Sequence, residues 1–536
     1  MKICIAQINS VVGDLQHNYS LISKAAKKAL DENVSLLITP ELSLTGYPPE
    51  DLLLNNNFLM EVNEKLLLLA KENPKIMIIV GHPLLEGEKL FNAASVIYKG
   101  KVFKKYKKQI LPNYGVFDEK RYFVPGNSSL IFNYKKLTIG VLICEDIWSK
   151  LPIENLIKNN VDLIVCINAS PYEIDKNNHR MKNIQRKIKG SNSKVVYVNT
   201  VGGQDDLLFD GGSFILDPNI GLVLSLPQFK ITNKIVELNS LNKNEVKDSL
   251  GSINILFDGL VLALKDYLQK NSIQKVFLGL SGGIDSAVVL CIAAKACSKK
   301  DIQTIMMPTK FTSKISLDDA KTLAKNIGVK YTIKRIDSLN NKINKIFEKD
   351  FLGYEADTTE ENIQARIRGL LLMTYANKFK GVVLATSNKS ETAVGYATLY
   401  GDMVGGFSVL KDVPKTWVYK LAQFINENEI IIPTRIITRA PSAELKDNQS
   451  DQDSLPDYEI LDGIIDLYLD KGHSPATIIK KGYDAFTVKK VVKLIHGSEF
   501  KRRQSAPGPK VTNKAFGKER RYPITNNFRI TTKGNS

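Results

Sequence analysis

The first 235 residues alternate between short apolar runs and amphipathic stretches, which predicts strands joined partly by turns and partly by helices. Residues 2–7 alternate between apolar and polar positions as a strand does, and residues 34–41 form a short apolar run behind a helical stretch. Residues 91–106 and 129–144 each contain two strand-like runs joined by a polar turn. Because hairpins are mixed with helix-linked strands, we expect a mixed sheet covered by helices.

The pattern changes behind a polar segment, residues 236–250, in which strand signals are missing. Regular alternation follows: helix 253–270, strand 275–280, a helix from Ser286, strand 303–308, helix 316–327 and strand 331–336. This order is typical of a doubly wound parallel sheet. Since a single core rarely grows beyond roughly 250–300 residues, the 536 residues predict two domains, 1–235 and 251–536, with 236–250 as the linker.

Composition narrows the class of protein. With 43% hydrophobic and 24% charged residues the chain is ordinary for a globular protein, and no apolar run approaches the roughly 20 residues of a membrane span. The N-terminus reads as a strand and lacks the features of a signal peptide, so we expect a cytoplasmic protein. A net charge of +18 favours an anionic partner but leaves nucleic acid, a membrane surface and a phosphorylated small molecule open.

The five cysteines are scattered, odd in number and without a CxxC pair. This argues against a disulfide framework and against a thiolate zinc site, so we expect free thiols. Cys166, Cys291 and Cys297 lie in apolar runs and are expected to pack in cores.

In the second half, the stretch KVFLGLSGGIDSAVVL (275–290) reads as a strand, a Ser-Gly-Gly turn and a helix. Glycines let a backbone approach an anion closely, and the N–H groups at a helix start attract phosphate. Ser281 and Ser286 add hydroxyl donors, and Asp285 beside a phosphate indicates a bridging cation such as Mg²⁺. A tight strand–helix turn would explain the glycines, but not this acid.

Three further stretches support a nucleotide site. Asn362 lies on the polar face of an amphipathic helix. A buried strand ends at Thr386 and is followed by Glu391 and Asp402, beyond the carboxyl end of the sheet, where such folds bind ligands. The segment 439–462 is acidic and polar, as expected for a loop over a phosphate–metal site. Capping and solvation would explain any one stretch, but not all three in this order.

Taken together, these stretches resemble the NAD⁺ synthetase family of the N-type ATP pyrophosphatases, and the resemblance extends through the tail EFKRRQSAPGPKVT. It implies that ATP adenylates the nicotinate carboxylate of deamido-NAD⁺ and that ammonia then displaces AMP. It also implies that Asn362, Glu391 and Lys501 contact the dinucleotide and that Asp285 and Glu391 are Mg²⁺ ligands. The residues implied for ATP are Gly279, Leu280, Ser281, Gly282, Gly283, Ile284, Asp285, Ser286, Thr386 and Ser442.

In the first half, VLICEDIW places Cys144 at the end of an apolar run, directly before two acids. A nucleophilic cysteine needs an activating base, and none of the five histidines has a neighbourhood that marks it as one. Glu41 ends a buried strand and Lys108 ends another strand, and each leads into a loop, so they are candidates to meet Cys144 in one site. Lys107 is an adjacent competitor, and we favour Lys108 because it lies three residues before Leu111.

Glu, Lys and Cys in these contexts resemble the nitrilase, or carbon–nitrogen hydrolase, superfamily, whose fold is an αββα sandwich. The stretches PELSLTGYPPEDLL, CEDIW and NASPY are similar to the glutaminase domain fused to many bacterial NAD⁺ synthetases. The resemblance implies that Glu41 takes the thiol proton, that Cys144 attacks the glutamine amide and that Lys108 holds the oxyanion. The residues implied for glutamine binding are Tyr114, Ser170 and Lys176.

The two resemblances together predict an α/β protein with an N-terminal αββα sandwich and a C-terminal Rossmann-like domain. They imply glutamine-dependent formation of NAD⁺ from ATP and deamido-NAD⁺, a homo-oligomer, an internal ammonia passage, and no nucleic-acid or membrane partner. Another adenylating amidotransferase or a tRNA-modifying relative stays open, because the net charge favours it, although thiolating relatives carry CxxC pairs. An inactive fold that binds nucleic acid would lack catalytic groups, yet Glu41, Lys108 and Cys144 are present.

Overall fold

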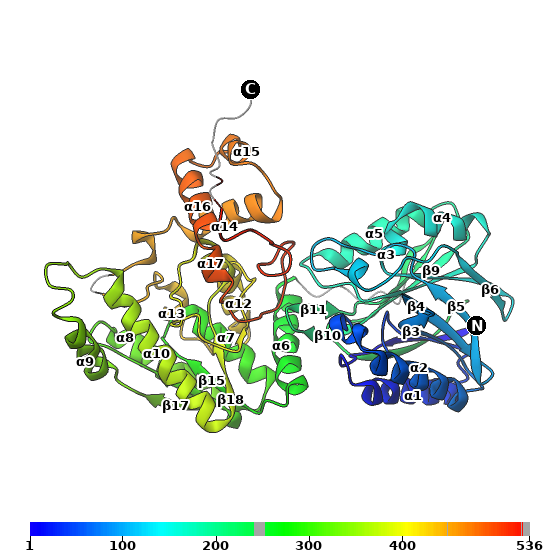
Figure 1. The fold of residues 1–536 in the computed structure, drawn as a ribbon, viewed down its shortest axis with the longest axis horizontal. Helices are drawn as coiled ribbons and strands as arrows, with labels where there is room; N and C mark the ends of the chain where they lie inside the picture. Colours follow the sequence, from blue (N-terminus) through cyan, green and yellow to red (C-terminus); the bar gives the residue numbers. More distant parts are fainter. Residues whose placement is uncertain (241–251, 447–448, 527, 529–536) are drawn as a thin grey trace. The chain divides into compact units, whose positions relative to one another are not determined.

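The computed structural model describes residues 1–240, 252–446, 449–526 and 528. The chain divides into two compact units, Met1–Ile255 and Leu256–Ser536 (Figure 1). Within the described residues, the first unit contains two six-stranded sheets and a two-stranded ribbon, and the second contains one five-stranded sheet.

Two mixed sheets form the centre of the first unit. The strands of one sheet are β1 (Lys2–Gln7), β2 (Leu36–Ile38), β3 (Met77–Glu86), β4 (Lys89–Tyr98), β5 (Lys101–Lys107) and β14 (Thr232–Glu237). Its order is β14-β1-β2-β3-β4-β5, with β1, β2 and β3 parallel. The strands of the other are β6 (Leu130–Tyr134), β7 (Leu137–Ile143), β8 (Leu163–Asn168), β9 (Lys194–Asn199), β12 (Phe214–Asp217) and β13 (Gly221–Ser225). Its order is β13-β12-β9-β8-β7-β6, with β7, β8 and β9 parallel.

Helices pack on both sheets of this unit. They are α1 (Leu15–Asp31) and α2 (Asn56–Glu72) on the first sheet, and α4 (Lys150–Lys158) and α5 (Lys176–Ile188) on the second. The alternation along β1 explains the layers. Ile3 and Ile5 belong to the apolar cluster that also contains the second sheet. Cys4 and Ala6 point the other way and pack in the cluster that contains α1 and α2 residues. The mixed sheets and the αββα sandwich predicted from the sequence are therefore confirmed.

The second unit is built on a parallel sheet. Its strands are β15 (Lys275–Gly279), β16 (Ile302–Met306), β17 (Lys330–Ile333), β18 (Gly381–Ala385) and β19 (Phe407–Ser408). The order is β17-β16-β15-β18-β19, and all neighbours pair in parallel. Its principal helices are α6 (Ser252–Lys270), α7 (Ile284–Ala296), α8 (Lys314–Ile327), α10 (Thr358–Phe379) and α12 (Lys415–Ile425). The predicted doubly wound sheet is confirmed, and the strand order reverses between β15 and β18, where such sheets bind ligands.

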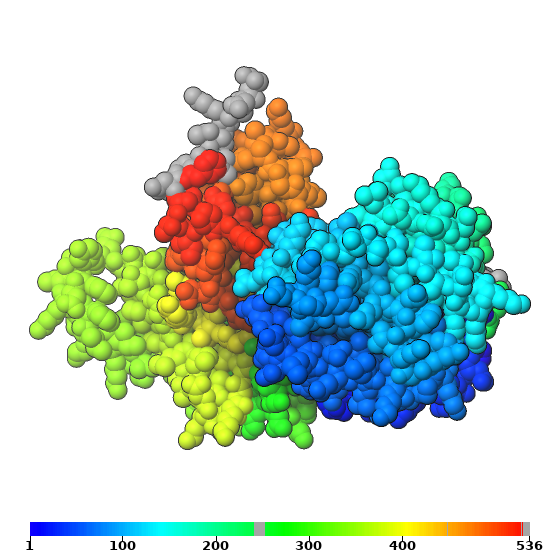
Figure 2. Space-filling view, turned by 45° about the vertical axis from the view of Figure 1, so that its right-hand side comes forward, coloured from blue at the N-terminus to red at the C-terminus, as the bar shows by residue number. Residues whose placement is uncertain are grey.

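A helical lobe follows the sheet in the sequence. It consists of α14 (Tyr458–Ile465), α15 (Pro475–Lys480) and α16 (Ala485–Gly497). Figure 2 shows this segment, in orange, standing out from the neighbouring parts of the unit. The lobe has its own apolar cluster, which includes Leu461, Ile478 and Val491. It contacts α12 and the short helix α11 (Lys389–Val394), and both of these helices begin at the candidate site described below.

Strand β14 ends at Glu237, so its last two residues lie within the segment 236–250, in which the sequence predicts no strand. Pairing with β1 satisfies their backbone groups. Residues 241–250 of that segment lie outside the described residues. All five cysteines are free thiols. Within the described ranges, no helix combines the length and the apolar character that a membrane crossing requires.

Candidate active sites

Cys144 stands at the end of β7, in the turn into the short helix α3 (Glu145–Trp148). Its φ of 45° is a left-handed value that a non-glycine residue adopts at a cost, and its N–H donates to Ile167 O at 2.9 Å. Burial raises the pKa of the Cys144 thiol well above its ordinary value, and Glu41 raises it further while Lys108 opposes the rise. The resting thiol is therefore protonated, and a nucleophilic attack by it needs a base.

Lys108 is the charged centre of the same site. Its Nζ lies 2.7 Å from Glu41 Oε1 and 2.8 Å from Glu119 Oε1, and all three side chains are buried. Burial disfavours the charged ammonium, but Glu119 and Glu41 outweigh it and raise the pKa of Lys108 well above its ordinary value. Burial also raises the pKa of Glu119 to about 7, although Lys108 opposes this shift. The site thus holds one cation between two buried carboxylates.

Further donors fix both carboxylates. Glu41 Oε1 accepts from Asn92 Nδ2 at 2.8 Å, and Glu41 Oε2 accepts from the Ala169 N–H at 2.9 Å. Glu119 Oε1 accepts from Tyr47 Oη at 3.0 Å. Because Asn92 lies on β4 and Ala169 follows β8, strands of both sheets position Glu41.

The two candidate lysines have different partners. Lys107 pairs with Glu86 at 2.6 Å, lies over the ring of Phe91 and is 32% exposed. Lys108 is buried and contacts Glu41. The alternation at the end of β5 sends neighbouring side chains to opposite faces, which is why one lysine is solvated and the other enters the site.

Asp146 organises the backbone around Cys144. Its carboxylate accepts from the N–H groups of Gln109 at 3.0 Å, Ile110 at 2.8 Å and Ile143 at 3.1 Å. Burial raises the pKa of Asp146 to about 6, against the effect of these donors. The side chain therefore ties the turn at Cys144 to the segment that directly follows Lys108.

The three residues implied for glutamine lie in different settings. Tyr114 is exposed and donates to Glu145 Oε2, next to Cys144, at 2.9 Å. Ser170 is buried, and Arg180 donates to its Oγ at 3.0 Å and to its carbonyl oxygen at 2.9 Å. Lys176 pairs with Glu173 at 2.9 Å. Tyr114 therefore contacts the residue that follows Cys144, and Ser170 follows Ala169, whose N–H donates to Glu41.

The second unit contains a cavity of about 290 Å³ at the carboxyl ends of its central strands. Gly279, Met306 and Leu384, at or near the ends of β15, β16 and β18, line it. Nine of the ten residues implied for ATP line this cavity, and Gly282 is the exception.

The backbone explains why Gly282 differs. Its φ is 82°, and a Cβ at this position would lie 2.5 Å from Ser316 O on α8. The Gly283 N–H donates to Ser281 Oγ at 3.2 Å, and Ser286 Oγ donates to Gly283 O at 3.0 Å. Gly282 therefore makes the tight turn against α8, while the residues on both sides of it line the cavity.

Two acids and one lysine meet in the cavity. Lys415 Nζ lies 2.5 Å from Asp285 Oδ2 and 3.2 Å from Glu391 Oε1. Asn388 caps α11 and donates to Asp285 Oδ1 at 2.9 Å. Burial raises the pKa of Glu391 to about 8, with Lys415 opposing the shift and Asp285 adding to it. Among the described residues, no group of three His, Cys, Asp or Glu side chains forms a metal cluster, so an ion here would take its remaining ligands from elsewhere.

Asn362 is not among the residues that line the cavity, but it contacts one that does. Its Oδ1 accepts from Thr398 Oγ1 at 2.7 Å, and Thr398 lines the cavity. The Thr398 N–H donates to Asp402 Oδ1 at 2.6 Å. Asp402 also lines the cavity, and burial raises the pKa of its carboxyl. Asn362 is thus linked to the cavity through one side chain.

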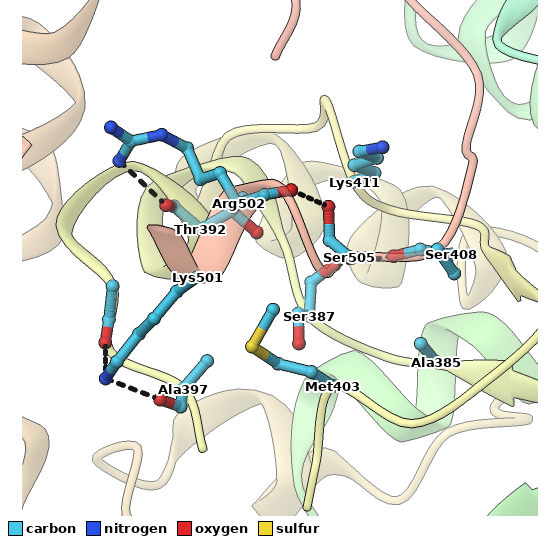
Figure 3. Close-up of a pocket in the computed structure, with 12 residues that line it drawn as sticks. Ala385, Ser387, Thr392, Ala397, Met403, Ser408, Lys411, Lys501, Arg502 and Ser505 are labelled. Carbon is cyan, nitrogen blue, oxygen red and sulfur yellow. Dashed lines mark hydrogen bonds between the residues drawn. The ribbon is translucent and has the colours of Figure 1, made fainter. Parts of the chain in front are cut away.

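Lys501 lines a second, much smaller pocket of about 10 Å³ (Figure 3). Its Nζ donates to the carbonyl oxygens of Gly395 and Ala397, both at 2.8 Å. Burial lowers the pKa of Lys501, and Asp402 opposes this shift. Ser387 lines both pockets, so the small one adjoins the large one. Of the three residues implied for the dinucleotide, Glu391 is the one in the large cavity.

Both halves of the chain match known families. The family model for carbon–nitrogen hydrolases matches residues 2–242, and that for NAD synthase matches residues 256–505. A glutamine-dependent NAD(+) synthetase of Acinetobacter baylyi is 46% identical, over 98% of this chain and 99% of that protein. This chain belongs to the glutamine-dependent NAD(+) synthetase family. A relative from Aquifex aeolicus is 40% identical over 98% of this chain and all of its own length. The structure of the Acinetobacter baumannii enzyme in complex with ADP covers 98% of both chains with a TM-score of 0.80 and 43% identity.

Sequence reasoning missed several members of these sites. Glu119 lies eleven residues after Lys108, and only its burial beside that lysine distinguishes it from other surface-type acids. Lys415 is 130 residues from Asp285, and no local pattern connects them. Asn388 had a usable signal, because Asn followed three residues later by Glu391 is a capping box that marks a helix start.

Proposed function

We propose that the first unit hydrolyses glutamine at Cys144 and that the second uses the ammonia and ATP to convert deamido-NAD⁺ into NAD⁺. The observation that carries the proposal is the buried contact of Lys108 with Glu41 in a site that includes Cys144. A lone buried thiol would be inert, whereas a thiol beside a fixed carboxylate and a fixed ammonium is equipped for acyl transfer.

In the glutaminase step, Glu41 takes the thiol proton as Cys144 Sγ attacks the side-chain amide carbon of glutamine. The Lys108 ammonium stabilises the oxyanion, and protonated Glu41 returns its proton to the departing nitrogen, which leaves as ammonia. Water, deprotonated by Glu41, then cleaves the thioester to give glutamate and the free thiol. We assign glutamine binding to Tyr114, Ser170 and Lys176.

In the synthetase step, the nicotinate carboxylate of deamido-NAD⁺ attacks the α-phosphorus of ATP and pyrophosphate leaves. Ammonia then attacks the acyl carbon, and AMP leaves. The N–H groups at the start of α7 and the hydroxyls of Ser281 and Ser286 bind the phosphates. We assign the dinucleotide to Asn362, Glu391 and Lys501, and the remaining ATP contacts to Thr386 and Ser442.

Asp285 and Glu391 suit a magnesium ion, because their oxygens already share one cation, the Lys415 ammonium, and carboxylates are ligands that Mg²⁺ prefers. A bound Mg²⁺ would neutralise charge on the pyrophosphate as it leaves. Asn388 supports the arrangement by holding the second oxygen of Asp285.

Nitrogen-source dependence tests the proposal. Purified protein is supplied with ATP, Mg²⁺ and deamido-NAD⁺ together with either glutamine or ammonium, and NAD⁺ is measured. We expect Cys144→Ala to lose glutamine-driven formation by more than roughly 10³-fold while ammonium-driven formation continues. Cys4→Ala, which removes a buried thiol in the same unit, is the matched control and keeps both. If the wild type makes NAD⁺ neither with glutamine nor with ammonium, the substrate assignment is wrong. If Cys144→Ala still uses glutamine, the nucleophile assignment is wrong.

We also propose a cytoplasmic homo-oligomer with an internal ammonia passage. The five free thiols support a reducing compartment. Sedimentation of the full chain tests the oligomer, and a single-chain mass would contradict it. Capture of the ammonia by a scavenging enzyme in solution, before it reaches NAD⁺, would contradict the passage.

A further inference from the structure

Three cationic side chains line the large cavity of the second unit, and they differ in their partners. Lys415 lies against Asp285 and Glu391, and Arg439 lies 3.6 Å from Glu444. Arg368 has no Asp or Glu oxygen within 4.0 Å in the part of the chain that the structure describes. Its Nε–H donates to the carbonyl oxygen of Met307 at 3.1 Å.

This leaves a guanidinium with unused binding capacity. Arginine has five N–H donors in a planar fork, and the contact with Met307 uses one of them. Burial lowers the pKa of Arg368 to about 10, and attraction from Glu444, Asp402 and Asp337 does not restore it. A partly buried charge that lacks a partner is costly, so a ligand that brings an anion would recover this free energy.

The position of Arg368 on α10 directs it to the cavity. Ala365, Gly369 and Leu372 also line the cavity, and with Arg368 they form one stripe at helical spacing. Arg366 lies outside this stripe, is exposed and donates to Leu399 O at 3.3 Å. Because α10 packs on β15 and β18, the stripe faces the point where the strand order reverses.

We propose that Arg368 binds phosphate oxygens of ATP in this cavity, as a substrate-binding residue for the adenylation step. The inference rests on the proposed function in one respect, namely that the cavity takes ATP. A guanidinium fork matches two phosphate oxygens, and the other two lining cations already have carboxylate partners. The adenosine part of the nucleotide carries no anion, so its own binding does not need Arg368.

Calorimetric titration of the full chain with Mg²⁺–ATP, in the absence of the dinucleotide, tests the proposal. We expect Arg368→Met to weaken ATP binding roughly 10- to 100-fold, as for loss of a hydrogen-bonded charge. Arg368→Lys keeps the charge but lacks the guanidinium fork, so its ATP affinity should lie between those of the wild type and Arg368→Met. Adenosine binding should be unchanged in all variants. Lys378→Met removes one charge from the exposed face of the same helix and should bind ATP as the wild type does.

Calorimetric unfolding of each variant, compared with that of the wild type, reports whether the second unit, which contains Arg368, is folded. Unchanged ATP affinity in a folded Arg368→Met chain would overturn the proposal, and so would an equal loss of adenosine binding, which would indicate a change in cavity shape. A separate titration with deamido-NAD⁺ would overturn the proposal in favour of the dinucleotide if Arg368→Met lost affinity for deamido-NAD⁺ but kept its affinity for ATP. If the wild type makes no NAD⁺ while its ATP affinity depends on Arg368, the proposed function fails and this inference stands.

Discussion

At the scale of single residues, the first site depends on how one ammonium is shared. Lys108 contacts Glu41 and Glu119 at nearly equal distances, 2.7 and 2.8 Å. When both acids are ionised, they share the ammonium of Lys108. When Glu119 is protonated, its attraction for Lys108 is lost, and the ammonium pairs with Glu41 alone. We therefore expect the charge of Glu119 to support the proposed role of Glu41 in taking the thiol proton.

Glu119→Gln tests this role. The substitution keeps the volume and removes the charge, so glutamine hydrolysis should fall by roughly 10- to 100-fold, less than most losses of a general base itself, because Glu41 stays in place. The wild-type rate should rise as the pH passes through about 7, where Glu119 ionises, and the variant should lack this rise. Ammonium-driven NAD⁺ formation should stay unchanged. A variant that keeps the same pH dependence would contradict the argument.

The raised pKa of Glu119 also makes the free energy of unfolding depend on pH. An acid whose pKa is raised by folding ionises first in the unfolded chain, so its contribution to stability is lost as the pH rises from about 4 to the folded value. For Glu119 the folded value is about 7. Its part of the unfolding free energy should therefore fall between those limits and be absent in Glu119→Gln, which pH-dependent thermal unfolding measures.

At the scale of elements, the turn from β15 to α7 contains two glycines that differ in how strictly the backbone requires them. Gly282 has a φ of 82° and no room for a Cβ against Ser316 O, whereas a Cβ on Gly283 would meet only Ser281 Oγ, at 3.3 Å. We expect Gly282→Ala to cost at least about 1–2 kcal/mol for the left-handed backbone alone. Gly283→Ala should cost less. Calorimetric unfolding without nucleotide compares the two, and equal losses would contradict the assignment of the turn to Gly282.

Elements were also where prediction from the sequence worked best. Period-two alternation identified β1, and the apolar runs identified β7, β15 and β18, because the apolar pattern of a strand's own residues predicts how it is buried. The ends of β2, β5 and β7 then indicated Glu41, Lys108 and Cys144 as neighbours. Glu119 and Lys415 escaped prediction because they act through tertiary contacts, which no local sequence pattern encodes. Resemblance supplied the order of the motifs. The sequence favoured Lys108 over Lys107 from its position before Leu111, and the packing shows that Lys108 contacts Glu41 whereas Lys107 pairs with Glu86.

At the scale of the whole molecule, the two sites belong to units with separate cores. The apolar clusters around β1 and β7 contain residues of the first unit, and those around β15 and α14 contain residues of the second. A substitution that disables one site without unfolding its unit should therefore spare the chemistry of the other. This separation allows the two half-reactions to be assayed independently in one intact chain.

Asp285→Asn makes that argument testable from the synthetase side. The amide cannot supply the negative charge that Asp285 presents to Lys415 and would present to the proposed Mg²⁺, so NAD⁺ formation should fall by roughly 10²-fold or more with glutamine and with ammonium alike. Glutamate release should continue, because Cys144, Glu41 and Lys108 are untouched. Asp318→Asn, on the exposed face of α8, removes the same charge and should keep both activities. Loss of glutamate release in a folded Asp285→Asn chain would mean that the glutaminase depends on an occupied synthetase site, and the independence of the two chemistries would then be wrong.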